Sequence, residues 1–185
     1  MEATDTLSSE HRVIERVIAA LEAGASRLES GQEIRIDFFT DAADFIAGFA
    51  DGCHHKKEEG VLFIAMQKQG MPVQGGPIGV MLAEHEQGRI YTRAMRAAAE
   101  RLEQGDLTAR QAVVQNARGY ANLLRNHIMK EDTVLFPMAD RIIPLDQQGQ
   151  VALDFERVEH EETGEGIHEK YLALAERLEK DVLDG

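Results

Sequence analysis

The sequence contains one cysteine, four prolines and no tryptophan among its 185 residues. With Cys53 alone, the chain cannot form an intrachain disulfide framework, so we expect a reducing compartment and a small, buried thiol. The scarcity of proline, beside abundant alanine, leucine and glutamate, disfavours a β-sandwich with its many turns and favours helices. Because 185 residues can bury a core without staples, we expect an all-α protein in one domain.

The sequence also lacks long apolar runs and an excess of basic residues. No stretch reaches membrane-spanning length, and the first residues form neither a basic nor an apolar signal segment, so we expect no membrane association and a cytoplasmic location. The formal net charge of −13 disfavours a nucleic-acid partner, because phosphate binding needs clustered lysine and arginine. An acidic balance suits a chain that supplies carboxylates to a cation, although most of these side chains must be solvated.

Glycine and proline divide the chain into five segments that are long enough to be helices. The predicted helices cover about residues 5–29, 37–69, 78–103, 108–142 and 150–183. Short connections between them favour antiparallel neighbours. We therefore predict a single domain over residues 1–185, built as an up-down-up-down four-helix bundle at about 5–142 with an additional C-terminal fifth helix at about 150–183.

An internal repeat relates the second and fourth segments. The run HHKKEEGVLF at 54–63 aligns without a gap on HIMKEDTVLF at 127–136. The alignment pairs two histidines and two glutamates, namely His54 with His127 and Glu58 with Glu131. The first and third segments also share a shorter, weaker repeat, the dipeptides Glu10-His11 and Glu84-His85. The repeat therefore predicts two related helical hairpins.

Helical periodicity indicates which polar side chains face the core, because residues at i, i+3, i+4 and i+7 share one face. On the first four predicted helices, four histidines and two glutamates lie on apolar faces: His11, His54, His85, His127, Glu58 and Glu131. On the second helix this spacing favours His54 and Glu58, since His55 and Glu59 lie about 100° further round.

Two inward-facing glutamates require compensation, because a lone buried carboxylate costs roughly several kcal/mol unless it is paired, protonated or bound to a cation. Any one of the four histidines alone is better explained as a hydrogen-bonded core residue. Four inward histidines with two glutamates at i+4 form a set that a metal ion compensates most simply. The constellation as a whole therefore predicts a metal site.

These residues also carry a family resemblance. The N-terminal His11, the run HHxxEExxLF at 54–63, the run EHExGR at 84–89 and the run HxxxEDxxLFP at 127–137 together resemble the hemerythrin-like (HHE) family. The resemblance spans about residues 5–140 and implies a hemerythrin-like four-helix bundle that holds two iron ions as Fe²⁺ or Fe³⁺. In this resemblance the four inward histidines bind the irons, and Glu58 and Glu131 bridge them, with an oxo or hydroxo bridge as a further option. Zinc and manganese remain alternatives, because imidazole and carboxylate also bind them.

The sequence departs from the oxygen-carrying hemerythrins in its third helix. In the carriers that this chain resembles, the third helix has the pattern HxxxH. Here Arg89 follows His85 at i+4 in place of the second histidine. In the fourth helix both Glu131 and Asp132 are available as the final carboxylate, and the internal repeat favours Glu131. With one histidine fewer than a carrier, the irons need a further ligand or solvent.

The fifth predicted helix is a candidate source of that ligand. An apolar stripe places His160 toward the bundle, so we include it among the expected metal ligands, with a hydrogen bond to a carboxylate behind the ligands as the alternative. Gly164 and Gly166 would let this helix kink or approach closely. Other possible ligands here stay open: His168, Glu161, Glu162 and Glu165.

Two classes of function follow from such a site. The reduced ligand set favours an enzyme, a di-iron oxidoreductase that reacts with a small oxidant, hydrogen peroxide or dioxygen. The alternative is a protein without turnover that binds dioxygen or nitric oxide, stores iron or senses these species. The expected partner is in both cases a small-molecule oxidant or diatomic gas, and the protein a monomer or homodimer. The sequence identifies no dedicated catalytic acid or base.

Overall fold

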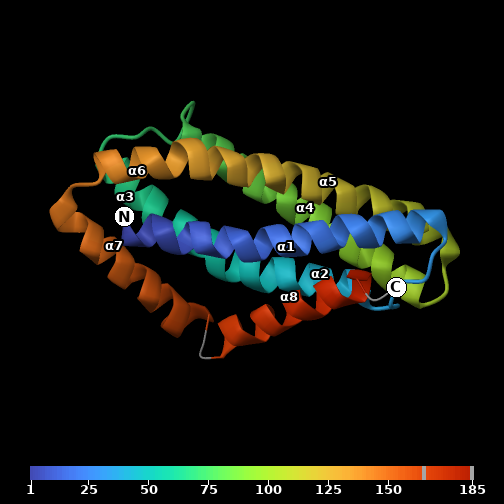
Figure 1. Ribbon diagram of the computed structural model, residues 1–185. Coiled ribbons are helices and arrows are strands. Elements are labelled where there is room, and N and C mark those ends of the chain that lie inside the picture. Colours follow the sequence, from blue (N-terminus) through green and yellow to red (C-terminus); the bar gives the residue numbers. More distant parts are fainter. Residues whose placement is uncertain (164–165, 184–185) are drawn as a thin grey trace.

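Four long helical segments form the body of the protein, and the computed structural model describes residues 1–163 and 166–183. Across this described part the chain contains no strand, so the all-α prediction is confirmed. The first and third bundle helices are continuous: α1 (Glu2–Ser30) and α4 (Pro77–Glu103). Figure 1 shows α1, α4 and α5 running along the length of the molecule, with the N-terminus beside α3, α6 and α7.

The second and fourth bundle helices are assembled from several pieces, and each contains π-helical turns near its predicted ligands. The second consists of α2 (Phe38–Phe45), the π-helices η1 (Ile46–His55) and η2 (Glu58–Leu62), and α3 (Phe63–Lys68). The fourth consists of a 3₁₀ turn η3 (Leu107–Ala109), α5 (Arg110–Lys130), the π-helix η4 (Glu131–Leu135) and α6 (Phe136–Ile142). π turns are rare, and they occur frequently at functional sites.

The breaks between bundle helices coincide with the glycines and the proline that predicted them. Gly31 ends α1 in the left-handed conformation with a φ of 74°, a conformation that glycine adopts without a steric penalty. Pro77 occupies the first turn of α4, where a missing N–H costs no hydrogen bond. The four-helix bundle is therefore confirmed near its predicted boundaries.

The predicted fifth helix is two helices. α7 (Leu145–Arg157) continues into the π-helix η5 (Val158–Thr163), and α8 (Ile167–Leu183) follows. We call residues 145–183 the C-terminal arm. α7 contacts α1 and η2 near the N-terminus, whereas α8 lies along α1 and α2 toward the other end of the bundle (Figure 1). Gly166, at a φ of 77°, stands at the start of α8, and Gly164 and Glu165 lie outside the described residues.

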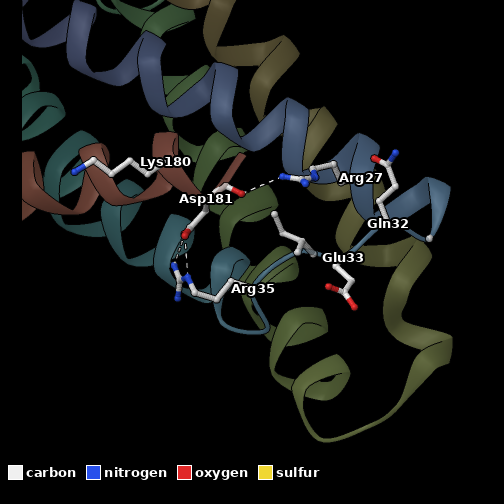
Figure 2. A pocket seen from close by; sticks show the side chains of 8 residues that line it. Arg27, Gln32, Glu33, Arg35, Lys180 and Asp181 are labelled. Atoms are coloured by element: carbon white, nitrogen blue, oxygen red, sulfur yellow. Dashed lines mark hydrogen bonds and ion pairs between the residues drawn. The ribbon is translucent and has the colours of Figure 1, made fainter. Parts of the chain in front are cut away.

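The end of α8 is held against the connection between α1 and α2, far from the predicted metal site. Arg35 Nε donates a hydrogen bond to Asp181 Oδ2 at 2.9 Å, and Arg27 Nη1 donates to the Asp181 carbonyl at 3.0 Å (Figure 2). A pocket of about 960 Å³ lies here, lined also by Glu33 and Lys180. Among its charged side chains, Arg27, Arg35 and Asp181 attach the arm to the bundle.

Two apolar clusters fill the bundle, and the predicted ligands lie between them. The larger cluster includes Ile14 and Phe49, and the smaller one includes Leu7 and Phe63 at the end near the N-terminus. His11 falls between Leu7 and Ile14 along α1, so the level of the histidines separates the two clusters. None of the helices in the described ranges is long and apolar enough to cross a membrane.

Candidate metal centre

The structure brings six of the seven predicted ligands together in the middle of the bundle. Each of the six is at most 1% exposed: His11, His54, Glu58, His85, His127 and Glu131. They come from all four bundle helices, because the first and third helices run opposite to the second and fourth and so place their histidines at one level. Their ligand atoms fall into two adjoining groups.

The first group consists of His11, His54, Glu58 and Glu131, with one ligand atom from each lying within 4.8 Å of the others. His11 Nε2 lies 3.2 Å from Glu131 Oε2, and His54 Nε2 lies 3.6 Å from Glu58 Oε1. This spacing is compatible with a single cation among the four side chains.

The second group consists of His55, Glu58, His85 and His127, again within 4.8 Å of one another. His85 Nε2 lies 3.4 Å from Glu58 Oε2, and His127 Nε2 lies 3.1 Å from Glu131 Oε1. Each glutamate therefore presents one oxygen to a histidine of the first group and the other oxygen to a histidine of the second. Carboxylates that lie between two groups of imidazoles in this way can bridge two cations.

His55, which the helical spacing ranks behind His54, also faces into the bundle. It is 3% exposed, and its ring stacks on that of His85 with centroids 3.8 Å apart. The preference for His54 assumed the 100° per residue of an α-helix. In η1 and η2 the hydrogen bonds close over five residues, so successive residues are closer in angle and both histidines face inward.

His160 does not lie with the other predicted ligands. It is exposed on η5 and belongs to neither group, so the structure gives no support to its assignment as a ligand. The stripe that placed it inward assumed one regular helix over 150–183, whereas η5 interrupts that helix. Among the residues left open, the side chains of Glu161, Glu162 and Glu165 lie outside the described part, and His168 lies near Cys53 instead.

Every histidine of the centre is held from behind by a carboxylate that contacts its Nδ1. The pairs are His11 with Asp132 (2.8 Å), His54 with Glu10 (3.0 Å), His55 with Asp51 (2.9 Å), His85 with Glu59 (2.7 Å) and His127 with Glu84 (3.0 Å). A carboxylate in this position fixes the proton on Nδ1 and leaves the Nε2 lone pair for a metal.

Sequence reasoning missed these outer carboxylates, although a signal for most of them was present. Glu10 and Glu84 directly precede His11 and His85, and Glu59 and Asp132 directly follow the two inward glutamates. The spacing in the fourth helix leaves Asp132 as the alternative to Glu131 for the inward carboxylate. The structure puts Glu131 inside the centre and Asp132 behind His11, where it also pairs with Arg12.

The internal repeat extends to the lysines behind the centre. Lys57 pairs with Glu10, and its counterpart Lys130 pairs with Glu84. One pair differs in its surroundings, because Lys57 is fully buried and also contacts Glu159 of the arm, whereas Lys130 is about a third exposed. The arm therefore covers one half of a nearly symmetric arrangement.

The buried charges shift the titration of the histidines. Burial opposes protonation of His11, but hydrogen bonds to Asp132 and Glu131 raise its pKa to about 9. Burial likewise opposes protonation of His127, and the negative charge of Glu131 raises that pKa to about 10. Burial, followed by the neighbouring imidazoles, lowers the pKa of His55 well below its usual value. The centre thus favours positive charge beside Glu131, whether protons or a metal supply it.

A metal site is indicated by buried ligand atoms that the protein itself does not supply with hydrogen bonds, and the centre contains such atoms. Within the described part of the chain, six buried atoms of the centre have no hydrogen-bond partner outside the centre: His11 Nε2, His54 Nε2 and both oxygens of Glu58 and Glu131. His85 Nε2 and His127 Nε2 face each other at 3.0 Å, although each ring already has a carboxylate on its Nδ1. Buried acceptors without donors are costly, and cations between them remove the cost.

Comparison with known proteins agrees with this arrangement. The family model described as hemerythrin HHE cation binding domain matches residues 2–139. Uncharacterised proteins of Mycobacterium tuberculosis and Mycobacterium bovis are each 25% identical over 180 residues, which cover 97% of this chain and 70% of the relative. No solved structure gave a significant match. The family match ends before the C-terminal arm, whereas the similarity to the mycobacterial proteins covers nearly the whole chain.

Proposed function

The chain belongs to the hemerythrin HHE cation-binding domain family, and on this premise we propose that it is a non-haem di-iron protein that reacts with a small oxidant, hydrogen peroxide or dioxygen. The observation that carries the proposal is the position of Glu58 and Glu131, each with one oxygen toward either group of histidines. Two carboxylates so placed hold two cations close together and neutralise part of their charge.

The donor set divides unequally between the two metals. His11 and His54 would hold one iron, and His55, His85 and His127 would hold the other, with both glutamates shared. Five imidazoles and two carboxylates suit iron, although the same donors accept zinc or manganese. His55 compensates for the histidine that Arg89 replaces in comparison with the oxygen carriers. The proposed ligand set therefore omits His160.

Bound iron would supply the electrons that a peroxide or dioxygen needs for its reduction. The protein's own contribution is orientation and charge. The carboxylates on Nδ1 keep each imidazole in one tautomer, and the apolar clusters on both sides keep bulk water from the ligands. His11 stacks on Phe136 with ring centroids 5.3 Å apart, which limits rotation of its ring.

A surface pocket supports reaction with a small molecule. It has a volume of about 400 Å³ and is lined by Asp51, Glu59 and Arg89, among others. Asp51 holds His55 and Glu59 holds His85, so only this outer layer of side chains separates the pocket from the second group of ligands. Arg89 Nη2 donates to Glu59 Oε1 at 2.6 Å, and Arg89 Nε lies 3.4 Å from Asp51 Oδ1. Because these ion pairs close the inner end of the pocket, the path from it to the ligands suits a diatomic gas or peroxide better than a large substrate.

The test compares metal content, optical spectrum and peroxide consumption in the purified protein and in three variants. His54→Ala and Glu131→Ala should each lower the iron content and the rate, whereas the exposed His160→Ala should change neither. Iron-loaded protein should consume peroxide faster than the same amount of free iron. A reversible oxygen-dependent absorption band without consumption of oxidant would instead indicate a carrier or sensor. Unchanged metal stoichiometry in both ligand variants would refute the assignment of the centre.

A further inference from the structure

A second cluster of metal-binding side chains lies outside the histidine and glutamate centre, where the C-terminal arm meets the bundle. It consists of Glu10 and Cys53 from the bundle and Glu159 and His168 from the arm, with one ligand atom from each lying within 4.8 Å of the others. Residues 159 and 168 lie beyond the part of the chain that the family model matches. Properties of that domain therefore do not account for the cluster.

Two of these side chains add a sulfur and a nitrogen donor to the carboxylates, and the Cys53 sulfur is also a hydrogen-bond partner of Lys57. Cys53 is 1% exposed and forms no disulfide. His168 Nδ1 is buried and lacks a hydrogen-bond partner within the described part of the chain, and it lies 3.5 Å from Glu159 Oε1. The His168 ring packs against Phe49 with centroids 5.2 Å apart, so this nitrogen is held near the bundle surface. A thiol, an imidazole nitrogen and a carboxylate oxygen thus converge from three separate segments.

We propose that Cys53, Glu159 and His168 bind a divalent transition-metal ion, with Zn²⁺ as the best match. Zinc is the borderline cation that takes sulfur, nitrogen and oxygen together. Because its bonds are about 2.0–2.3 Å long and tetrahedral, its ligand atoms lie about 3.3–3.8 Å from one another. The ligand atoms of this cluster all lie within 4.8 Å of one another, so small movements of the side chains would bring them to an ion. The di-iron ligands include no sulfur, so the two sites differ in the metals they prefer.

The charges around the cluster balance when such a cation is present. Lys57 Nζ pairs with Glu10 and lies 3.2 Å from Glu159 Oε2. Glu10 is already held by His54 and Lys57, so we assign it to the edge of the site and leave the fourth position to its oxygen or to water. The two positive charges of the metal then match the Cys53 thiolate and Glu159, while Lys57 neutralises Glu10.

A metal at this position would fasten the arm to the bundle. Cys53 belongs to η1, which also carries His54 and His55, whereas Glu159 and His168 stand on either side of the junction between α7 and α8. The cation would thus fix the middle of the arm, as Arg35 and Asp181 fix its end (Figures 1 and 2). The inference does not depend on what metal the central site holds or on what that site does.

Cobalt titration tests the proposal on full-length protein that a chelator has first stripped of its metals and whose central site has then been reloaded with iron. Co²⁺ bound by a thiolate gives a sulfur-to-cobalt charge-transfer band in the near ultraviolet, and Cys53 is the sole cysteine of the chain. We expect this band to saturate at one equivalent of Co²⁺ per chain and to disappear when Zn²⁺ is added. Cys53→Ser should abolish it, and His168→Ala should weaken Co²⁺ binding at least tenfold. His160→Ala, an exposed change on the same arm, should leave the titration unchanged.

The outcomes separate this site from the central one. Cobalt held by histidine and glutamate alone shows no sulfur band, so loss of the central site would not mimic loss of this one. Circular dichroism of Cys53→Ser and His168→Ala should match the parent protein, which excludes a failure to fold. Absence of the band in the parent protein, or unchanged Co²⁺ affinity in His168→Ala, would overturn the proposal.

Discussion

Each histidine of the centre is paired with a carboxylate. The carboxylate contacts Nδ1 and leaves Nε2 for a metal. The carboxylate raises the basicity of the imidazole and holds its ring in place. His55 extends this pattern to a fifth imidazole, because Asp51 holds it at 2.9 Å. Its counterpart in the internal repeat is Ile128, so the two halves of the centre differ by one histidine. This difference gives the two irons unequal surroundings.

Replacing His55 tests whether the two proposed metal ions have different numbers of histidine ligands. We expect His55→Ala to lose about half of its iron, because the second metal then keeps two imidazoles and the first keeps all its ligands. Metal analysis after equilibration with a weak chelator measures the loss. His160→Ala serves as the matched control and should retain its full iron content. A His55→Ala protein that keeps all its iron and an unchanged spectrum would show that His55 only packs in the core.

How far single residues could be predicted depended on the regularity of their helix. On the continuous α1, α4 and the body of α5, the spacing of apolar residues identified His11, His85 and His127 as inward-facing. On the second helix the same rule preferred His54 over His55, although both are buried, because the sequence gives no recognised signal for a π turn. The outer carboxylates could not be predicted in this way. Most of them contact a histidine on another helix, and the spacing of residues within one helix gives no information about such contacts.

At the level of elements, π-helical turns and a broken arm shape the site. η1, η2 and η4 each lie at or beside a proposed ligand, and η5 ends the first half of the arm. The sequence predicted the bundle helices because glycine and proline mark their ends. It predicted one helix at 150–183 with a possible kink at Gly164 and Gly166, and α8 does begin directly after Gly166. The π-helix η5 before it has no recognised sequence signal.

The contact between α8 and η1 gives a prediction at this scale. A Cβ at Gly48 would overlap the Tyr171 hydroxyl and ring, whereas a Cβ at Gly60 would meet no described atom within 4 Å. Gly48→Ala should therefore displace α8 and lower the free energy of unfolding by about 1–3 kcal/mol, the usual cost of overpacking. Gly60→Ala should leave it unchanged or raise it by up to about 1 kcal/mol.

Urea denaturation of both glycine variants measures these differences, and hydrogen exchange shows where they arise. In Gly48→Ala the amides of α8 should exchange faster, while those of α4 and α5 keep their protection. Equal stability of the two variants would mean that Tyr171 moves aside without cost and that α8 is not held at this contact.

For the whole molecule, the important quantity is the balance between an acidic chain and the positive charge in its core. The formal net charge is −13, and five outer carboxylates surround the centre in addition to the two inner glutamates. Without metal, protons on histidine provide the compensating charge, as the raised pKa values of His11 and His127 indicate. Metal and protons therefore compete for the same lone pairs, and metal affinity should rise with pH.

This competition predicts opposite behaviour for the metal-free and metal-loaded protein. An unfolded histidine has a pKa of about 6.5, whereas His11 and His127 in the fold titrate at about 9 and about 10. The stabilisation from their protonation is complete below the unfolded pKa and is lost as the pH rises through the folded values. The free energy of unfolding of metal-free protein should therefore fall between about pH 6.5 and pH 10. Metal-loaded protein should show no such fall, because its Nε2 atoms carry metal instead of protons. Urea titrations of both forms across this range measure the slopes, and a metal-free protein whose stability stays level or increases would contradict the proton–metal exchange.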